Sequence, residues 1–259
     1  MFYDCVDDQY IGCSSMRQKS RYIPLEGKYN KTWETARSHW YRRGQTRRGQ
    51  TVGSFDPIYG TAIVAYTVGD DLYRDFNTAV REAGKSQNSY DQFAFKHFFF
   101  LLTKALQAKK TDDRCYEVFR GIKGIHFTVS DEVVRFGQFA SSSLDKKVAQ
   151  KFGEDTLFSV KTCYGVPIYD FSYHKDQKEV LIPPYETFTV INHKSNRNGV
   201  FIRLESRGVF SRFNCGVLNG DTMRNPTIQM VPLLCLIGFF TGPLQVQTEQ
   251  LQQQECPPP

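Results

Sequence analysis

The chain has 259 residues, a length that suits one large domain or two small ones and allows a sizeable core. Its 40% hydrophobic content, with 21 Phe and 14 Tyr, excludes an intrinsically disordered chain. A formal net charge of +6 slightly favours anionic small molecules or surfaces and identifies no partner.

Two helices are predicted in the first half of the chain. Residues 70–84 place an apolar stripe on one helical face and end at Gly84. Ser89 and Gln92 form a plausible capping box for a second helix. Its apolar stripe consists of Phe95, Phe98, Phe99, Leu102 and Leu106. Aromatic residues at helical spacing indicate a buried core face rather than a cofactor site.

Between these segments and the N-terminus lies the basic run YRRGQTRRGQ, which holds Arg42, Arg43, Arg47 and Arg48. A nucleic-acid surface would interleave such arginines with stacking aromatics on a sheet or groove. Here they stand among Gly, Gln and Thr, so we expect a solvated surface loop and no nucleic-acid binding.

From Cys115 onwards, short runs rich in β-branched and aromatic residues predict strands. These runs are YEVFRG, RFGQFASSS, TLFSVKT, EVLIP, ETFTVINH and GVFIRLE. One helix, residues 144–152, interrupts them, with Ser143 as N-cap and Gly153 as its end. Helices followed by strands predict an α+β fold, helix-rich over 1–110 and strand-rich over 114–217, within a single domain of residues 1–225.

The two ends of the chain bear on its location. The start, MFYDCVDDQY, has acidic residues where a secretory signal peptide is apolar, so no signal is recognised. Residues 230–244 are apolar but broken by Thr241, Gly242 and Pro243, which disfavours a membrane span. A glycosylphosphatidylinositol (GPI) signal would end in its apolar tail, whereas TEQLQQQECPPP follows here. We therefore expect residues 226–259 to be a disordered or processed tail.

Seven cysteines are dispersed along the chain without a Cys-x-x-Cys pair, so structural zinc is not expected. They are Cys5, Cys13, Cys115, Cys163, Cys215, Cys235 and Cys256. Such cysteines fit either long-range disulfides of an oxidising compartment or buried free thiols, and their spacing leaves both open. A sequon at Asn30 is compatible with secretion and glycosylation.

Polar groups at strand ends are the candidates for chemistry. Arg120 closes an apolar strand, where an arginine is either a surface residue or a fork that grips a phosphate or carboxylate. Ser141, Ser142 and Ser143 end another strand. One of them is expected to cap the following helix, which requires no further function, while a serine one or two positions earlier would point into any cleft at the strand end. Glu179 is the first residue of a strand whose apolar sequence indicates burial. A carboxylate at such a position usually lies at the surface, but a carboxylate held in an apolar cleft can stabilise an oxocarbenium-like centre.

The three motifs VFRG at 118–121, FASSS at 139–143 and QKEVLIPPYE at 177–186 resemble those of the vertebrate ecto-ADP-ribosyltransferases. The signature of that family is an Arg, a Ser-x-Ser strand and a Glu-x-Glu loop, in this order. The similarity also covers DDQYIGC at 7–13, YGTAIVAYT at 59–67 and FNCGV at 213–217, and CYGVPIYDFSYH looks most like the secreted branch.

The resemblance implies an enzyme that cleaves NAD+ at the nicotinamide glycosidic bond and transfers ADP-ribose to protein arginine, without a metal. It implies that Arg120 holds the phosphate or ribose side of NAD+ and that Gly121 offers backbone hydrogen bonds to the nicotinamide carboxamide. Ser141 would orient the catalytic carboxylate, Glu179, which would bind the ribose 2′-hydroxyl and stabilise positive charge as the bond breaks.

One position departs from the family pattern. Arginine-directed members carry Glu two residues before the catalytic Glu, where this chain has Gln177. An amide cannot act as a base towards the acceptor guanidinium, so we expect NAD+ hydrolysis to be retained and arginine transfer to be weak.

The resemblance also implies fold, bridges and location. It implies helices packed on two perpendicular β-sheets with the NAD+ cleft between them, and disulfides Cys13–Cys215 and Cys115–Cys163. These bridges favour an oxidising compartment. From the tail and the resemblance to the secreted branch we expect a secreted rather than a GPI-anchored protein, and we expect a monomer with arginine-containing acceptor proteins as partners. The pairing of the other cysteines stays open. The competing hypothesis is a catalytically silent cell-surface or secreted binding protein on the same scaffold.

Overall fold

The structure is a computed structural model that describes residues 4–13, 25, 27–46, 55–197 and 199–215. The predicted tail, residues 226–259, and the apolar stretch within it lie outside the described residues, as do Cys235, Cys256, Arg47 and Arg48. Among the described residues, no helix combines the length and the apolar character that crossing a membrane requires.

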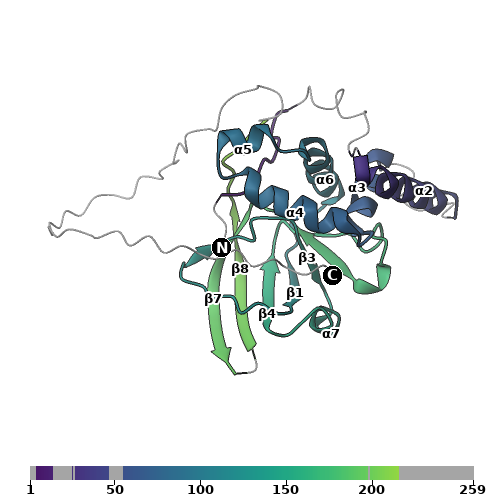
Figure 1. The fold of residues 1–259 in the computed structure, drawn as a ribbon. Coiled ribbons are helices and arrows are strands. Elements are labelled where there is room, and N and C mark those ends of the chain that lie inside the picture. Colours follow the sequence, from purple (N-terminus) through teal and green to yellow (C-terminus); the bar gives the residue numbers. More distant parts are fainter. Residues whose placement is uncertain (1–3, 14–24, 26, 47–54, 198, 216–259) are drawn as a thin grey trace.

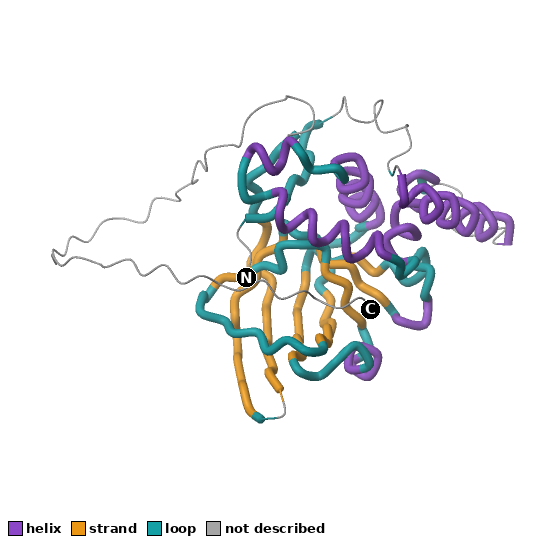
Figure 2. The backbone as a smooth tube through the Cα atoms, in the orientation of Figure 1, coloured by secondary structure: helices purple, strands orange, loops and turns teal. Residues whose placement is uncertain are grey.

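The helices come first along the chain and gather on one side of the molecule, above the strands in the view of Figure 1. They are the 3₁₀ turn η1 (Gly27–Tyr29), α2 (Asn30–Thr46), α3 (Pro57–Thr67), α4 (Asp71–Ala83), α5 (Gln87–Asp91) and α6 (Lys96–Lys109). Carboxylate caps begin two of them: Asp56 accepts from the amide of Ile58, and Asp70 accepts from that of Leu72. The segregation of helices from strands confirms the predicted α+β class (Figure 2).

The predicted helix at 70–84 is confirmed as α4, whereas the predicted capping box is wrong. Ser86, not Ser89, caps α5, and Gln92 ends that helix rather than stabilising the start of the next. The chain then turns through Phe93 and Phe95, which are both buried, and α6 begins only at Lys96. Burial of these two aromatics in the core replaces the side-chain cap that sequence spacing suggested.

The sequon and the described part of the basic run both fall on α2. Arg42 and Arg43 belong to its last turns, so the prediction of a loop is wrong at these two positions. Asn30 is the exposed first residue of the helix. Thr32 of the same sequon is buried, and its hydroxyl donates a hydrogen bond to Asp70 at the start of α4.

The strands pair as one hydrogen-bonded series in the order β2-β7-β8-β4-β1-β3-β6-β5. Their bounds are β1 (Tyr116–Ile122), β2 (Val133–Val134), β3 (Ala140–Ser143), β4 (Thr156–Thr162), β5 (Val166–Pro167), β6 (Glu179–Ile182), β7 (Glu186–Asn196) and β8 (Gly199–Val209). Among the strand pairs of the described residues, only β4 and β8 run parallel. The expectation of two separate perpendicular sheets is therefore corrected to a single mixed sheet, which a lone bridge between Phe119 and Ser143 makes continuous.

The buried apolar residues form two clusters. The larger lies among the helices and is rich in aromatics, with Phe76 in contact with Phe98 and Phe139. The smaller lies within the sheet, around Val118, Phe158 and related strand residues. Phe139 belongs to the helical core although it directly precedes β3, so the serine motif begins where the two cores meet.

Buried charge and disulfides join distant parts of the chain. Asp7, fully buried, accepts a hydrogen bond from Arg135 at 2.7 Å and from the backbone amides of Arg212 and Phe213 at 2.9 and 3.1 Å. Cys13 and Cys215 form a disulfide beside this cluster.

A second disulfide joins Cys115 to Cys163, so both pairings that the resemblance implied are found in the structure. Cys5 is buried as a free thiol, and burial raises its pKa to about 12.

Candidate active site

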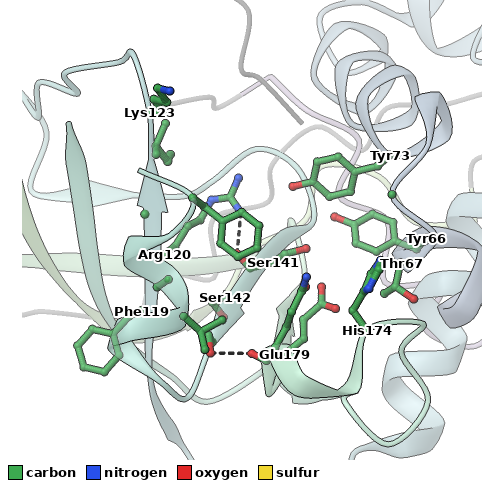
Figure 3. A pocket seen from close by; sticks show the side chains of 18 of the residues that line it. Tyr66, Thr67, Tyr73, Phe119, Arg120, Lys123, Ser141, Ser142, His174 and Glu179 are labelled. Atoms are coloured by element: carbon green, nitrogen blue, oxygen red, sulfur yellow. Dashed lines mark hydrogen bonds between the residues drawn. The ribbon is translucent and has the colours of Figure 1, made fainter. Parts of the chain in front are cut away.

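A pocket opens between the helices and the strands, where all three sequence motifs meet (Figure 3). Strands β1, β3 and β6 and the short helix α7 (Lys146–Gln150) form one wall. The ends of α3 and α4 form the other, through Tyr66, Thr67 and Tyr73. The candidates Arg120, Gly121, Ser141, Gln177 and Glu179 all line it.

Glu179 is the first residue of β6 and is 6% exposed. The hydroxyl of Ser172 donates to its Oε2 at 3.3 Å. Burial raises the pKa of the Glu179 carboxyl above its ordinary value. Ser141, Ser172 and the positive charge of Arg120 act in the opposite direction and favour the carboxylate.

Arg120 is half-buried on β1, and its Nη1 donates to the backbone carbonyl of Ser141 at 2.6 Å. This bond ties the guanidinium to the strand that carries the serine motif. The arginine therefore lies in the pocket wall, as the second of the two sequence interpretations requires. A guanidinium fixed in this way presents N–H donors and a permanent charge to an anion such as a phosphate.

The three serines have different environments. Ser141 lines the pocket beside Glu179 and favours the ionised form of that carboxyl, which lowers its pKa. Ser142 donates to the carbonyl of Val180 at 2.7 Å, which reinforces the pairing of β3 with β6. Ser143 donates to the carbonyl of Gln177 at 2.7 Å and accepts from the amide of Asp145 at 3.0 Å.

The predicted cap of the helix after the serine motif is wrong. Asp145, not Ser143, is the N-cap of α7, and its carboxylate accepts from the amide of Lys147. The helix spans Lys146–Gln150 rather than residues 144–152. The reason is that β3 extends through Ser143, which lies opposite Glu179 in the strand pairing and is held in extended conformation there.

Close packing of the backbone explains why residue 121 is a glycine. A Cβ atom built at this position would lie 2.2 Å from the carbonyl oxygen of Ala149 and 2.3 Å from that of Gly153. These are backbone atoms that cannot rotate away, so β1 approaches α7 closely only with glycine here. The backbone hydrogen bonds from Gly121 to the nicotinamide carboxamide, which the resemblance implies, stay a prediction beside this packing requirement.

Gln177 ends the 3₁₀ turn η2 (Lys175–Gln177), is half-buried and lines the pocket two residues before Glu179. Between them Lys178 adopts a left-handed conformation with φ of 47°, which is uncommon for a residue with a side chain. Its ammonium pairs with Asp145 at 3.3 Å, and its carbonyl accepts from the amide of Leu144 at 3.2 Å. The loop that presents Gln177 and Glu179 is thus fixed to the segment that follows β3.

Sequence reasoning missed the pocket residues that come from the helices and from the loop before η2. Thr67 accepts a hydrogen bond from the amide of Tyr173 at 2.9 Å, which holds that loop against α3. His174 follows and lines the pocket. Thr67 lies in the stretch YGTAIVAYT, and Ser172 and His174 lie in the stretch CYGVPIYDFSYH, so the family resemblance covered these residues without assigning any of them to the site.

The pocket contains a cation, a buried carboxylate and hydroxyls. Over the described residues, no group of three or more His, Cys, Asp and Glu side chains is arranged to hold a metal ion.

Comparison with known proteins adds to this geometry. The family described as NAD:arginine ADP-ribosyltransferase matches residues 1–211. The chain is 42% identical over 222 residues to the NAD(P)(+)–arginine ADP-ribosyltransferase 2 of Gallus gallus, a match that covers 82% of this chain and 70% of that protein. It is 39% identical over 231 residues to the human GPI-linked NAD(P)(+)–arginine ADP-ribosyltransferase 1, covering 81% and 71%.

Among solved structures, the eukaryotic mono-ADP-ribosyltransferase ART2.2 is similar, with a TM-score of 0.70 and 38% identity over 82% of this chain and 96% of that chain. A mutant of ART2.2 was crystallised in complex with NAD. The matched region contains the entire pocket, from Tyr66 to Glu179. The fold, the pocket and these similarities agree, and the chain belongs to the NAD:arginine ADP-ribosyltransferase family.

Proposed function

We propose that the protein is a mono-ADP-ribosyltransferase that cleaves NAD+ at the bond between nicotinamide and ribose and transfers ADP-ribose to arginine side chains of acceptor proteins. The observation that carries the proposal is the burial of Glu179 in one pocket with Arg120 and Ser141. Similar proteins carry this activity in their names, and a relative of known structure binds NAD.

The chemistry of the pocket supports the bond-breaking step. Nicotinamide leaves as a neutral molecule because the bonding electron pair returns to its cationic ring nitrogen, so positive charge accumulates on the ribose. The carboxylate of Glu179 stabilises that charge and accepts a hydrogen bond from a ribose hydroxyl. Arg120 is the cation placed to hold the anionic part of the substrate. The acceptor then bonds to the anomeric carbon from the opposite face and loses a proton.

Gln177 sets the balance between the two acceptors, water and arginine. A guanidinium is protonated at any accessible pH and must lose a proton to become a nucleophile. An amide at position 177 hydrogen-bonds but accepts no proton. We infer that hydrolysis of NAD+ dominates in this protein and that transfer to arginine is the slower reaction.

The test follows nicotinamide release and labelled ADP-ribose transfer to agmatine in the same reaction. The proposal expects nicotinamide release well in excess of transfer, and a Gln177→Glu variant in which the transferred share rises. Gln177→Asn is the matched control, since it keeps an amide and should leave the transferred share low. Transfer equal to total nicotinamide release in the natural protein would contradict the dominance of hydrolysis.

The competing hypothesis of a catalytically silent binding protein is tested by the same assay. Absence of nicotinamide release from the folded, disulfide-intact protein would favour that hypothesis over an enzyme.

We further propose that the protein acts outside the cell, as a monomer. Two disulfides support an oxidising compartment, and the human relative is named as GPI-linked. An epitope-tagged full-length protein should reach the medium or the outer cell surface. Release from cells by a phospholipase specific for GPI would favour an anchored over a secreted form. Light scattering on the purified protein checks the monomeric state, and a dimer mass would contradict it.

A further inference from the structure

A buried serine connects the candidate carboxylate to the loop that precedes η2. Ser172 is fully buried, and its hydroxyl lies 3.3 Å from Oε2 of Glu179. The same oxygen accepts a hydrogen bond from the backbone amide of His174 at 3.2 Å. The carbonyl oxygen of His174, at 3.4 Å, is a second acceptor within reach of the serine proton. In the view of Figure 3, His174 lies between Glu179 and Thr67 of α3.

The destination of the single serine proton depends on the charge of Glu179. A hydroxyl donates one proton, and an ionised carboxylate only accepts. Hydrogen bonds to an ionised acceptor are about twice as strong as those between neutral groups. The proton of Ser172 therefore goes to Oε2 when Glu179 is ionised. Only the ionised carboxyl gains this stronger bond, because a protonated one competes with the carbonyl of His174 as one neutral acceptor against another.

The helical layer fixes the position of Ser172 through both of its neighbours in the chain. Phe171 is buried, with its ring centroid 5.0 Å from that of Trp40 on α2. Tyr173 donates its backbone amide to the hydroxyl of Thr67 on α3 at 2.9 Å. The serine hydroxyl is thus held at a place that contacts with α2 and α3 determine.

The sheet fixes the other end of the same hydrogen bond. Glu179 belongs to β6, and its backbone carbonyl accepts from the amide of Ile168 at 2.9 Å. The carbonyl of Ile168 in turn accepts from the amides of Phe171 and Ser172 at 2.8 and 2.7 Å, which closes a tight turn. The backbone and the side chain of Glu179 are therefore bonded to the two ends of one short turn, residues 168–172. Catalytic groups depend on such neighbouring hydrogen bonds to lock their rotamers.

We propose that Ser172 is a positioning residue that orients the carboxylate of Glu179 through the bond to Oε2 and thereby couples the helical layer to the bond-breaking step. The inference rests on the proposed function of Glu179 in NAD+ cleavage. Ser172 lies outside the three sequence motifs and does not itself line the pocket, so it acts on the substrate only through Glu179.

The test is a Ser172→Ala variant, which removes the hydroxyl and adds no bulk. We expect kcat for nicotinamide release to fall about 2- to 10-fold, the factor that one hydrogen bond is worth, with KM for NAD+ changed less than about twofold. The two constants separate because positive charge develops on the ribose only after NAD+ has bound, so an oriented carboxylate acts on the transition state. Ser172→Thr keeps a hydroxyl and should recover part of the lost kcat.

The matched control is Ser206→Ala. Ser206 on β8 donates to Oε1 of Glu186, another fully buried glutamate, at 2.6 Å, and neither residue lines the pocket. Its loss should lower stability without changing kcat, which separates loss of orientation at Glu179 from the general cost of removing a serine–carboxylate bond. Equal falls in kcat in the two alanine variants would overturn the inference.

The pH dependence of the variant gives a second measurement. Burial raises the pKa of the Glu179 carboxyl, and Ser172 is one of the groups that lower it, so the acidic limb of the pH–rate profile should move to higher pH in Ser172→Ala. A histidine also changes charge near neutral pH. The same shift should therefore be present in a His174→Gln background, which keeps the backbone amide that bonds to Ser172. The other charged or titratable side chains of the pocket are Tyr66 of α3, Tyr73 of α4, Arg120 of β1 and Lys123, which follows β1.

A measurement without turnover separates this inference from the proposed function. The carbonyl stretch of protonated Glu179, assigned by comparison with Glu179→Gln, reports the ionisation of this carboxyl. A higher titration midpoint in Ser172→Ala supports the inference even in a protein that does not cleave NAD+, where an unchanged midpoint overturns it. In an active protein, an unchanged midpoint together with an unchanged kcat overturns it. If Ser172→Ala does not fold, Ser172→Cys, whose thiol is a weak donor, replaces it in both measurements.

Discussion

Ser143 on β3 lies directly opposite Glu179 on β6, and its hydroxyl donates to the carbonyl of Gln177, two residues before that glutamate. The serine motif and the glutamate loop are thus joined both by strand pairing and by a side chain. Because opposed residues share a face of the sheet, Ser141 and Glu179 also point to the same side. The register of one short strand pair therefore determines the geometry of the candidate site.

Replacement of Glu179 by Gln should stabilise the folded protein at neutral pH. Burial raises the folded-state pKa of this carboxyl, so the folded protein binds the proton more tightly than the unfolded chain. The favourable contribution of Glu179 to folding stability is therefore fully present when the pH lies below the pKa of this carboxyl in the unfolded chain. It is lost as the pH rises through the pKa of the carboxyl in the folded protein. We expect Glu179→Gln to raise the free energy of unfolding by about 0.5–2 kcal/mol at pH 7. Urea denaturation at pH 7 and pH 4 checks this, and a gain that persists unchanged in acid would contradict it.

Gly121→Ala should destabilise the protein and disturb the pocket together. The added methyl group would meet the carbonyl oxygens of Ala149 and Gly153, which belong to or follow α7. Overpacking of this kind costs about 1–3 kcal/mol. Gly124→Ala is the control for the activity: its φ of 76° strains an alanine and costs some stability, but nothing lies within 4 Å of its Cβ position, so it should leave nicotinamide release unchanged. Thermal unfolding and nicotinamide release of both variants test the prediction, which fails if Gly121→Ala behaves like Gly124→Ala.

Arg135→Met should cost about 3–5 kcal/mol of stability, because it leaves the carboxylate of Asp7 buried without its cation. Adding Asp7→Asn should recover part of the loss, since the amide oxygen still accepts from the backbone of Arg212 and Phe213. The exposed pair of Lys161 and Glu205 is the control, and Lys161→Met should cost less than about 1 kcal/mol. Equal losses from the buried and exposed pairs, measured by chemical denaturation, would refute the argument.

Removal of the Cys13–Cys215 disulfide as a double serine variant should lower stability by about 2–5 kcal/mol. The bridge spans 202 residues, against 48 for Cys115–Cys163, so the chain-entropy model predicts a loss about 1 kcal/mol larger for the first bridge. Denaturation midpoints of the two double variants under oxidising conditions provide the comparison. A larger loss from the shorter bridge would rule out loop closure as the main cause.

The sequence predicted those parts of the site that lie in short motifs. The resemblance identified Arg120, Ser141 and Glu179 as a set before any spatial relation was known. Glu179 begins β6 as expected, whereas Arg120 and Ser141 lie inside β1 and β3 rather than at their ends. Their approach depends on pairing between β1, β3 and β6, which are separated along the chain by a helix and several turns. Local patterns do not encode such pairing, so convergence became visible only in the structure.

The helical wall of the pocket could not be predicted from local patterns. Tyr66 and Asn77 look like ordinary members of buried helical stripes, but their polar atoms bond to each other, and the Tyr66 hydroxyl bonds to the carbonyl of Phe139 across the domain. The misplaced caps have a similar cause. Ser89 and Ser143 satisfy the local capping rule, but burial of Phe93 and strand pairing at Ser143 prevail over it.

The most direct test of the central claim is the rate of nicotinamide release from NAD+ by the purified, disulfide-intact protein, compared with its Glu179→Gln variant. We expect measurable nicotinamide release by the natural protein and a rate about 10²- to 10³-fold lower in the variant, with folding intact. Equal rates in the two proteins would contradict the assignment of Glu179 as the catalytic carboxylate.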